Sequence, residues 1–194
     1  MSRIVETLSA SRALPKLLAA LAHEPSPILL DLGPVVGTNV SFFGDRLFCK
    51  MLIEDLREEV EAALKTGSTE GLAERLSERV TDAVSEPVHG VLCWDLFDCL
   101  DRPTARALAR SLCGVLRPKG VLHGLFGTTA GDLDFRTKFI VQSDTAVKCR
   151  REPAARLRRY ALQTGEIARL FEGLSTIESV LLQNHTREVL LRKP

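Results

Sequence analysis

The segment from Ile28 to Asn39 constrains the fold of this chain most strongly. It reads Ile-Leu-Leu-Asp-Leu-Gly-Pro-Val-Val-Gly-Thr-Asn, an apolar run that ends in an acid and is followed by two glycines. Apolar runs of this kind are typical of parallel strands buried on both faces. Glycines after such a strand let the backbone turn sharply or approach a ligand closely. The segment therefore predicts a strand over 27–32 that turns into a helix, with a ligand site at its carboxyl end.

Strand-like and helix-like segments alternate along the rest of the chain. Apolar strand patterns occupy 46–53, 90–97, 121–126, 139–147, 176–182 and 187–191. Helical periodicity occupies 3–23, 39–44, 56–65, 70–80, 100–116 and 164–171. This alternation predicts an α/β fold, a three-layer α/β/α sandwich around a mostly parallel sheet. The last two strands predict an antiparallel hairpin at the end of the chain.

Composition is consistent with a single globular domain over 1–194, in which 1–25 form an N-terminal helical extension. Apolar residues make up 45% of the chain and charged residues 26%, which is ordinary for such a domain. The formal net charge is +1, so no overall field attracts nucleic acid or an anionic membrane. No apolar stretch approaches the ~20 residues of a membrane span. The N-terminus lacks the apolar core of a signal peptide.

The cysteines and histidines favour a cytoplasmic protein without a metal site. The five cysteines include no Cys-x-x-Cys pair, and the four histidines are scattered singly. Zinc sites need clustered ligands. Unpaired cysteines among apolar neighbours are typical of reduced thiols in a protein core. We therefore expect a cytoplasmic location and no bound metal.

The spacing of the glycines indicates which nucleotide-like ligand the first strand could serve. The dinucleotide fingerprint Gly-x-Gly-x-x-Gly and the P-loop are both absent from this segment. Asp31, Gly33 and Gly37 instead match motif I of the class I S-adenosylmethionine-dependent methyltransferases, except that Val35 takes the place of the middle glycine. The segment thus resembles this family, whose Rossmann-like fold carries an antiparallel hairpin at its end.

Later segments extend the resemblance over about 25–193. The stretch 91–98 looks like the family's motif IV, and 116–122 looks like its Leu-Arg-Pro-Gly-Gly-x-Leu turn. The combination is similar to a group of uncharacterised bacterial methyltransferase-like proteins. The family usually has a third strand before motif IV, but 56–89 is filled by helix-like sequence. That strand is either missing or reduced to a remnant at 80–84, with Asp82 near the adenine.

The resemblance implies that S-adenosylmethionine is the cofactor and names the residues around it. An acid after the second strand, Glu54 or Asp55, holds the ribose hydroxyls in the family. The implied cofactor-binding residues are Asp31, Gly33, Pro34, Val35, Gly37, Asn39, Glu54, Asp55, Trp94 and Asp95. The resemblance names no catalytic residue, because methyl transfer depends mainly on positioning.

Several of these residues also have a purely structural interpretation. Glu54 or Asp55 could cap the next helix. Trp94, the only tryptophan, could stack on adenine, wall the substrate cleft or fill the core. Asp95 and Asp98 could orient a substrate or take a proton, or be solvated loop acids. The basic run over 148–159 could contact an acidic substrate or form a solvated helix face.

Two functions are consistent with the sequence. The first is an S-adenosylmethionine-dependent methyltransferase of unknown substrate, favoured by the retained glycines and acids. The second is a degenerate methyltransferase fold that acts as a non-catalytic binding or oligomerisation module. Val35 favours the second, because a valine at positive φ costs about 1–2 kcal/mol and its side chain would crowd the cofactor. The methyl acceptor and the oligomeric state remain open, and nucleic acid is not favoured as a partner.

Overall fold

A six-stranded sheet forms the centre of the molecule in the computed structural model, which describes residues 4–194. Its strands lie in the order β3 (Lys50–Ile53), β2 (Ile28–Asp31), β4 (Val88–Leu92), β5 (Leu116–Gly127), β9 (Thr186–Arg192) and β8 (Ser175–Leu181). The strands β3, β2, β4 and β5 are parallel, and β9 runs antiparallel to both β5 and β8. The expected mostly parallel sheet and the closing antiparallel hairpin are both confirmed.

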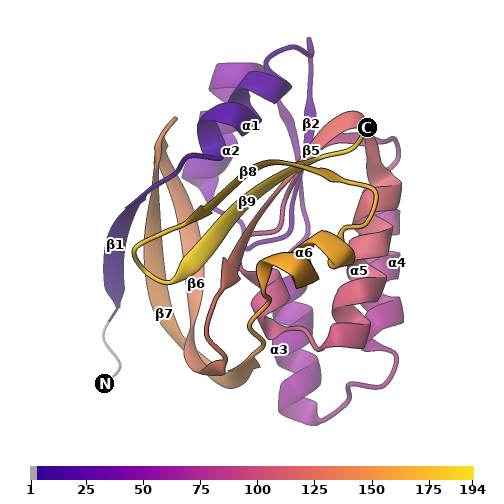
Figure 1. Cartoon of the computed structure of the whole chain (residues 1–194), viewed down its shortest axis with the longest axis vertical. Coiled ribbons are helices and arrows are strands. Elements are labelled where there is room, and N and C mark those ends of the chain that lie inside the picture. Colours follow the sequence, from indigo (N-terminus) through magenta and orange to yellow (C-terminus); the bar gives the residue numbers. More distant parts are fainter. Residues whose placement is uncertain (1–3) are drawn as a thin grey trace.

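Helices cover both faces of this sheet, because successive side chains of a buried strand point to opposite faces. Leu29 of β2 packs with α1 (Leu14–Leu21) and α2 (Gly37–Leu47) on one face. Leu30 packs on the other face, with four helices and a short 3₁₀ turn. These are α3 (Leu56–Thr66), α4 (Leu72–Ala83), η1 (Leu96–Cys99), α5 (Arg102–Val115) and α6 (Thr164–Leu170). Figure 1 shows α3, α4 and α5 gathered on one side of the molecule.

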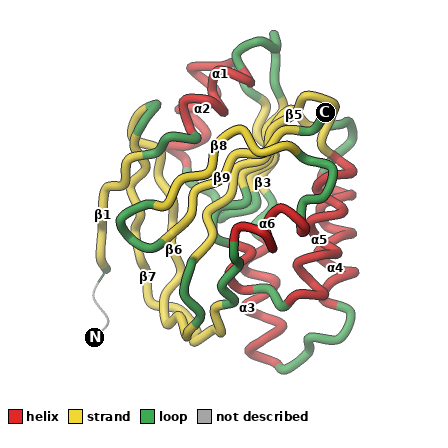
Figure 2. The backbone as a smooth tube through the Cα atoms, viewed as in Figure 1, coloured by secondary structure: helices red, strands yellow, loops and turns green. Residues whose placement is uncertain are grey.

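A second sheet lies on the opposite side from α4 and α5 (Figure 2). It contains β1 (Val5–Ala10), β7 (Ala146–Arg159) and β6 (Gly131–Ser143), in that order and antiparallel throughout. Phe139 and Val147 on its inner face join the same apolar cluster as α1 and α2. The second sheet therefore shares a core with the first.

Three sequence expectations are wrong in this region. The helix expected over 3–23 is a strand in its first half, because residues of β1 pair with β7 from Val5 opposite Arg151 to Ala10 opposite Ala146. Only α1 is helical, and positions 1–3 of the expected 1–25 extension lie outside the described residues. The single strand expected over 139–147 is interrupted by the turn between β6 and β7. The basic run over 148–159 lies on strand β7 rather than on a helix face.

The third strand of the methyltransferase pattern has no counterpart in the described residues. The connection from β3 to β4 consists of α3 and α4, and the suggested remnant at 80–84, including Asp82, belongs mainly to α4. As a result β2 is an interior strand that lies next to the edge strand β3. Along the chain, β2 is followed by β3 on one side of it and then by β4 on its other side. The direction in which strands are added to the sheet therefore reverses between β2 and β4. This reversal makes the carboxyl ends of β2 and β4 the switch point where open α/β sheets bind ligands.

No helix in the described part of the chain is long and apolar enough to cross a membrane.

Candidate functional site

The switch-point crevice is built by the loops that follow β2 and β4. Trp94, just beyond β4, has a positive φ of 48°, which costs a non-glycine residue about 1–3 kcal/mol. Its indole lies directly over Gly33, where an added Cβ would be 2.8 Å from Trp94 Cδ1. Trp94 Nε1–H donates a 2.6 Å hydrogen bond to Asp31 Oδ1. A glycine is therefore required at position 33 because the tryptophan ring occupies the space above it.

Asp31 is the most buried of the predicted cofactor-binding acids, with 2% of its surface exposed. Burial raises the pKa of Asp31 to about 6, although hydrogen bonds from the Gly33 amide and from Trp94 oppose the rise. The Gly33 amide donates to the same oxygen at 2.9 Å. The acceptor sites of Oδ1 are thus used within the protein.

Asp31→Asn is expected to change how stability depends on pH. The pKa of Asp31 is higher in the folded chain than its ordinary ~3.9. The folded state therefore binds this proton more tightly, and the resulting stabilisation is lost as pH rises through about 6. Between about pH 7 and about pH 5, the unfolding free energy of the wild type should rise by about 1 kcal/mol more than that of Asp31→Asn. Urea denaturation at both pH values measures this, and parallel pH profiles would contradict the assigned shift.

Strand β6 covers the crevice through contacts with Asn39 and Trp94. Asn39, near the start of α2, donates from Nδ2 to the Phe139 carbonyl at 2.8 Å and accepts from the Val141 amide at 2.8 Å. The Phe139 ring stacks on Trp94, with ring centroids 5.1 Å apart and an interplanar angle of 4°. The space left between the loops, Trp94 and β6 is about 20 Å³. That volume holds about one water molecule.

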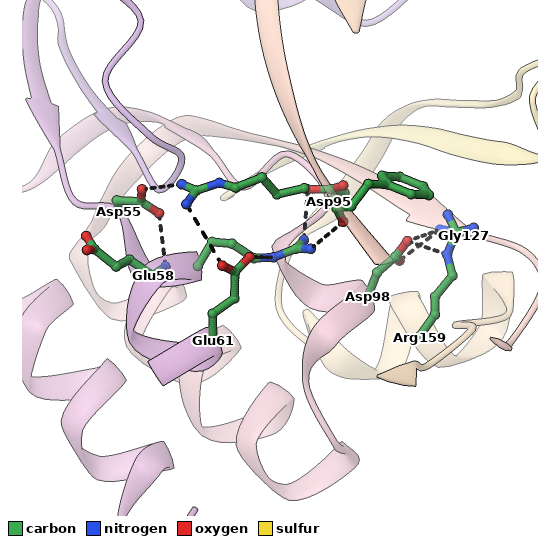
Figure 3. Close-up of polar contacts among 10 residues, drawn as sticks. Asp55, Glu58, Glu61, Asp95, Asp98, Gly127 and Arg159 are labelled. Carbon is green, nitrogen blue, oxygen red and sulfur yellow. Dashed lines mark hydrogen bonds and ion pairs between the residues drawn. The ribbon is translucent and has the colours of Figure 1, made fainter. Parts of the chain in front are cut away.

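The two acids after β3 are both engaged with other parts of the protein. Glu54 forms an ion pair with Arg79 of α4, whose Nε lies 2.6 Å from Oε1. Asp55 caps α3 by accepting from the Glu58 amide at 3.2 Å, as one of the structural alternatives expected. The other oxygen of Asp55 accepts from Arg136 of β6 at 2.9 Å. Figure 3 shows Asp55 and Glu58 in this arrangement.

Asp95 and Asp98 each face an arginine, the buried Arg57 and the half-buried Arg159. Arg57 of α3 lies 3.6 Å from Asp95 and is also hydrogen-bonded to Glu61 (Figure 3). Burial raises the pKa of Asp95, and the charges of Arg57 and Arg159 oppose the rise.

Asp98 anchors β7 to η1. Its carboxylate accepts from Arg159 Nε at 2.8 Å and from the Gly127 amide at 2.8 Å. Burial raises the pKa of Asp98 to about 6 against the charge of Arg159. The interpretation of Asp98 as a solvated loop acid is therefore wrong.

Val35 does not close the crevice, contrary to the sequence expectation. Its φ is not positive, its side chain is 70% exposed, and it is absent from the walls of the remaining space. Pro34 does line that space, and Gly37 begins α2 with open room around its Cα. The residues that fill the crevice are Trp94 and Phe139.

The basic run on β7 is largely neutralised by neighbouring acids. Lys148 lies 3.5 Å from Glu6, and Arg156 lies 2.6 Å from Asp132. This pairing gives no support to an acidic substrate along β7.

Sequence reasoning missed two features of this region. The first is the β6–β7 hairpin, whose only sequence signal is a weak alternation of apolar residues such as Leu133, Phe135 and Phe139. The second is a larger cavity between the two sheets, of about 520 Å³. A buried pair, His123 and Glu188, lines that cavity, and neither residue stands in a recognisable motif.

Comparisons with solved structures agree on the fold. The chain is similar to 1,6-didemethyltoxoflavin-N1-methyltransferase from Burkholderia thailandensis, with a TM-score of 0.53 and 16% identity over 94% of this chain and 77% of that one. It is similar to an S-adenosylmethionine-dependent methyltransferase from Clostridium acetobutylicum, with a TM-score of 0.52 and 10% identity over 93% of this chain and 90% of that one. It is also similar to the N-methyltransferase NodS from Bradyrhizobium japonicum, with a TM-score of 0.52 and 14% identity over 94% of this chain and 94% of that one.

No protein-family model matches the chain. No curated protein matches its sequence. The likeness to solved structures nevertheless spans nearly the whole chain. The chain therefore has the fold of the class I S-adenosylmethionine-dependent methyltransferases.

Proposed function

We propose that this chain is an S-adenosylmethionine-dependent methyltransferase whose cofactor crevice is closed in the described conformation. The observation that carries the proposal is the switch point itself. There the acid of motif I, its two glycines and the acid after β3 stand at the carboxyl ends of neighbouring parallel strands. The Burkholderia thailandensis enzyme with this fold was crystallised with S-adenosylhomocysteine. The methyl acceptor stays open.

The residue types suit the cofactor, but the space in this conformation does not. Carboxylates such as Asp31 and Glu54 have acceptor sites for an amino group and for ribose hydroxyls. One oxygen of each is already used, Asp31 Oδ1 by Trp94 and Glu54 Oε1 by Arg79, and the free space is about 20 Å³. Ordinary ligand pockets have volumes of about 300–1,000 Å³. Cofactor entry therefore requires Trp94 and Phe139 to move apart from Gly33.

The closed crevice is also the specific observation that favours the second function, a binding or oligomerisation module without methyl transfer. In that case the contacts among Asn39, Phe139 and Trp94 are permanent parts of the core. The two functions differ in one respect that can be measured, because only the first requires affinity for S-adenosylmethionine or its product.

Calorimetric titration with S-adenosylmethionine and S-adenosylhomocysteine tests the proposal. We expect binding, and we expect Glu54→Ala to weaken it by about tenfold, or about 1.4 kcal/mol. Glu70→Ala, at an exposed position in the turn before α4, is the matched control and should bind as the wild type does. If folded protein binds neither ligand at millimolar concentration, the methyltransferase proposal fails and the binding-module function stands.

A further inference from the structure

The cavity of about 520 Å³ between the two sheets adjoins the switch-point crevice. Four residues line both spaces, namely Trp94, Asp95, Thr137 and Phe139. A volume of this size lies within the range of pockets that hold small organic molecules. A molecule in the cavity therefore lies on one side of the wall whose other side faces the cofactor crevice.

The alternation of side chains along the second sheet directs Arg151 toward this cavity. Arg151 of β7 lies opposite Thr137 of β6, and directly paired residues of antiparallel strands point to the same face. Thr137 lines the cavity, and so do Val147 and Cys149, which alternate with Arg151 along β7. The guanidinium of Arg151 lies over the Phe135 ring at 4.6 Å, and both residues belong to the cavity wall. Arg151 thus places a positive charge on the inner face of the second sheet.

Arg151 is an exception to the pairing of charges along β7. Lys148 and Arg150 lie at positions of the opposite parity and pair with Glu6 instead. Arg151 forms no ion pair with any residue in 4–194. Its side chain is exposed, so a molecule that enters the cavity can reach it. A guanidinium binds a carboxylate through two parallel, charge-assisted hydrogen bonds.

The other charges in the cavity wall do not cancel this one. The acid Glu188 accepts hydrogen bonds from a hydroxyl and two amides of the segment after β1. The acid Asp95 lies 3.6 Å from an arginine of α3, and Arg159 is paired with a buried acid of η1. Among the described residues of the wall, only Arg12 and Arg151 are charged groups without such a partner. The cavity therefore favours an anionic ligand.

The wall shared with the crevice offers a different chemistry. Phe139 is the diagonal neighbour of Arg151 across the β6–β7 pair, a separation of about 7–8 Å between backbones. The stacked rings of Phe139 and Trp94 form an aromatic surface there. Asp95 and Thr137, in the same wall, carry oxygens that accept a hydrogen bond from a hydroxyl. A single aromatic ring with a carboxylate at one end and a hydroxyl at the other bridges this separation.

We infer that the cavity between the two sheets binds a small hydroxylated aromatic acid, with its carboxylate on Arg151 and its hydroxyl beside Asp95 and Thr137. The inference rests on the proposed function where it names this class of molecule as the methyl acceptor. In the transfer, the hydroxyl oxygen forms a bond to the methyl carbon, the electron pair of the broken carbon–sulfur bond stays on sulfur, and the hydroxyl proton passes to water. Binding of the acid itself requires no cofactor in the crevice.

Paired probes test the inference by calorimetric titration. In para-hydroxybenzamide an amide replaces the carboxylate of para-hydroxybenzoate, so the two probes differ in charge but hardly in shape. We expect the wild type to bind the acid about fivefold tighter than the amide. Arg151→Gln should bind the two probes within about twofold of each other, because it loses the positive charge. The position is exposed, so the variant is expected to fold.

Arg158→Gln is the matched control. Arg158 lies on the same strand and over an aromatic ring, that of Tyr160 at 5.3 Å, but it is not part of the cavity wall. This variant should keep the wild-type preference for the acid. Loss of the preference in Arg158→Gln would show a general effect of charge and would overturn the inference.

A second measurement locates the acid beside Trp94, which carries the only indole N–H of the chain. In ¹⁵N-labelled wild type, para-hydroxybenzoate should shift the indole resonance. Equal affinities for the two probes in the wild type, an unchanged preference in Arg151→Gln, an indole resonance that does not move, or no binding at millimolar concentration would each overturn the inference. None of these titrations contains S-adenosylmethionine, so their failure is distinguishable from failure of the proposed function.

Discussion

Replacing Trp94 by alanine should lower the free energy of unfolding by about 3–5 kcal/mol. The indole is 4% exposed and joins the two sheets, because it stacks on Phe139 and lies against Gly33. The substitution also removes the Nε1–H donor from the buried carboxylate of Asp31. Guanidinium denaturation followed by circular dichroism measures the loss, since the variant has no tryptophan to report by fluorescence.

Trp94→Phe separates packing from hydrogen bonding in the same experiment. It keeps an aromatic ring against Phe139 but leaves Asp31 with only the Gly33 amide, so a smaller loss of about 1–3 kcal/mol is expected. An alanine variant that loses under about 1 kcal/mol would show that the indole is not part of the packed core.

Replacing Glu188 by alanine should cost about 3–5 kcal/mol, because it removes a buried carboxylate and leaves several hydrogen-bond donors unpaired. The donors are His123, the Ser11 hydroxyl and the amides of Arg12 and Ala13. Urea denaturation measures the cost, with exposed Glu172→Ala as the matched control. A cost equal to that of the control would contradict the network as described.

The pH dependence of this effect has a definite sign. The pKa of Glu188 in the folded chain is about 2, below its ordinary ~4.3. Its stabilisation is therefore complete above about pH 4.3 and is lost as pH falls from there toward about 2. The difference in unfolding free energy between the wild type and Glu188→Gln should shrink over that interval. A constant difference would contradict the lowered pKa.

The parts of the fold that the sequence predicts are those that depend on local patterns. The run from Ile28 to Asp31 is apolar enough to predict a buried strand from its own residues. Strands β8 and β9 are joined by a short turn and pair with each other, so their hairpin is also a local feature. The second sheet is different. Strand β1 is held by pairing with β7, with Val5 opposite Arg151. The residues of Val5–Ala10 alone do not show whether the segment forms a helix or a strand, because the strand depends on pairing with the distant β7.

The candidate site also has one part that the sequence predicts and one part that it does not. Asp31, Gly33 and Trp94 come together because the strands that precede them are parallel neighbours, so the alternation of strands and helices was sufficient to place them at one edge. The closure was not predictable, because it depends on Asn39 meeting the backbone of Phe139, a hundred positions along the chain. The sequence predicts an obstruction at Val35 because this residue departs from motif I, yet its side chain is 70% exposed.

The account's central claim is that the cofactor crevice exists and is closed by Phe139 and Trp94. If so, the measured affinity for cofactor is reduced by the small fraction of molecules that are open. Loosening β6 should raise that fraction. Phe139→Leu weakens the stack on Trp94, and Asn39→Asp removes the donor to the Phe139 carbonyl while keeping the acceptor for Val141. Val35→Gly is the matched control, because it changes motif I without touching the closure.

The most direct measurement is calorimetric titration of S-adenosylhomocysteine into these folded proteins side by side. The account predicts that Phe139→Leu and Asn39→Asp bind about tenfold tighter than the wild type, and that Val35→Gly binds as the wild type does. Equal affinities in the wild type and both loosened variants, or tighter binding by Val35→Gly alone, would contradict it.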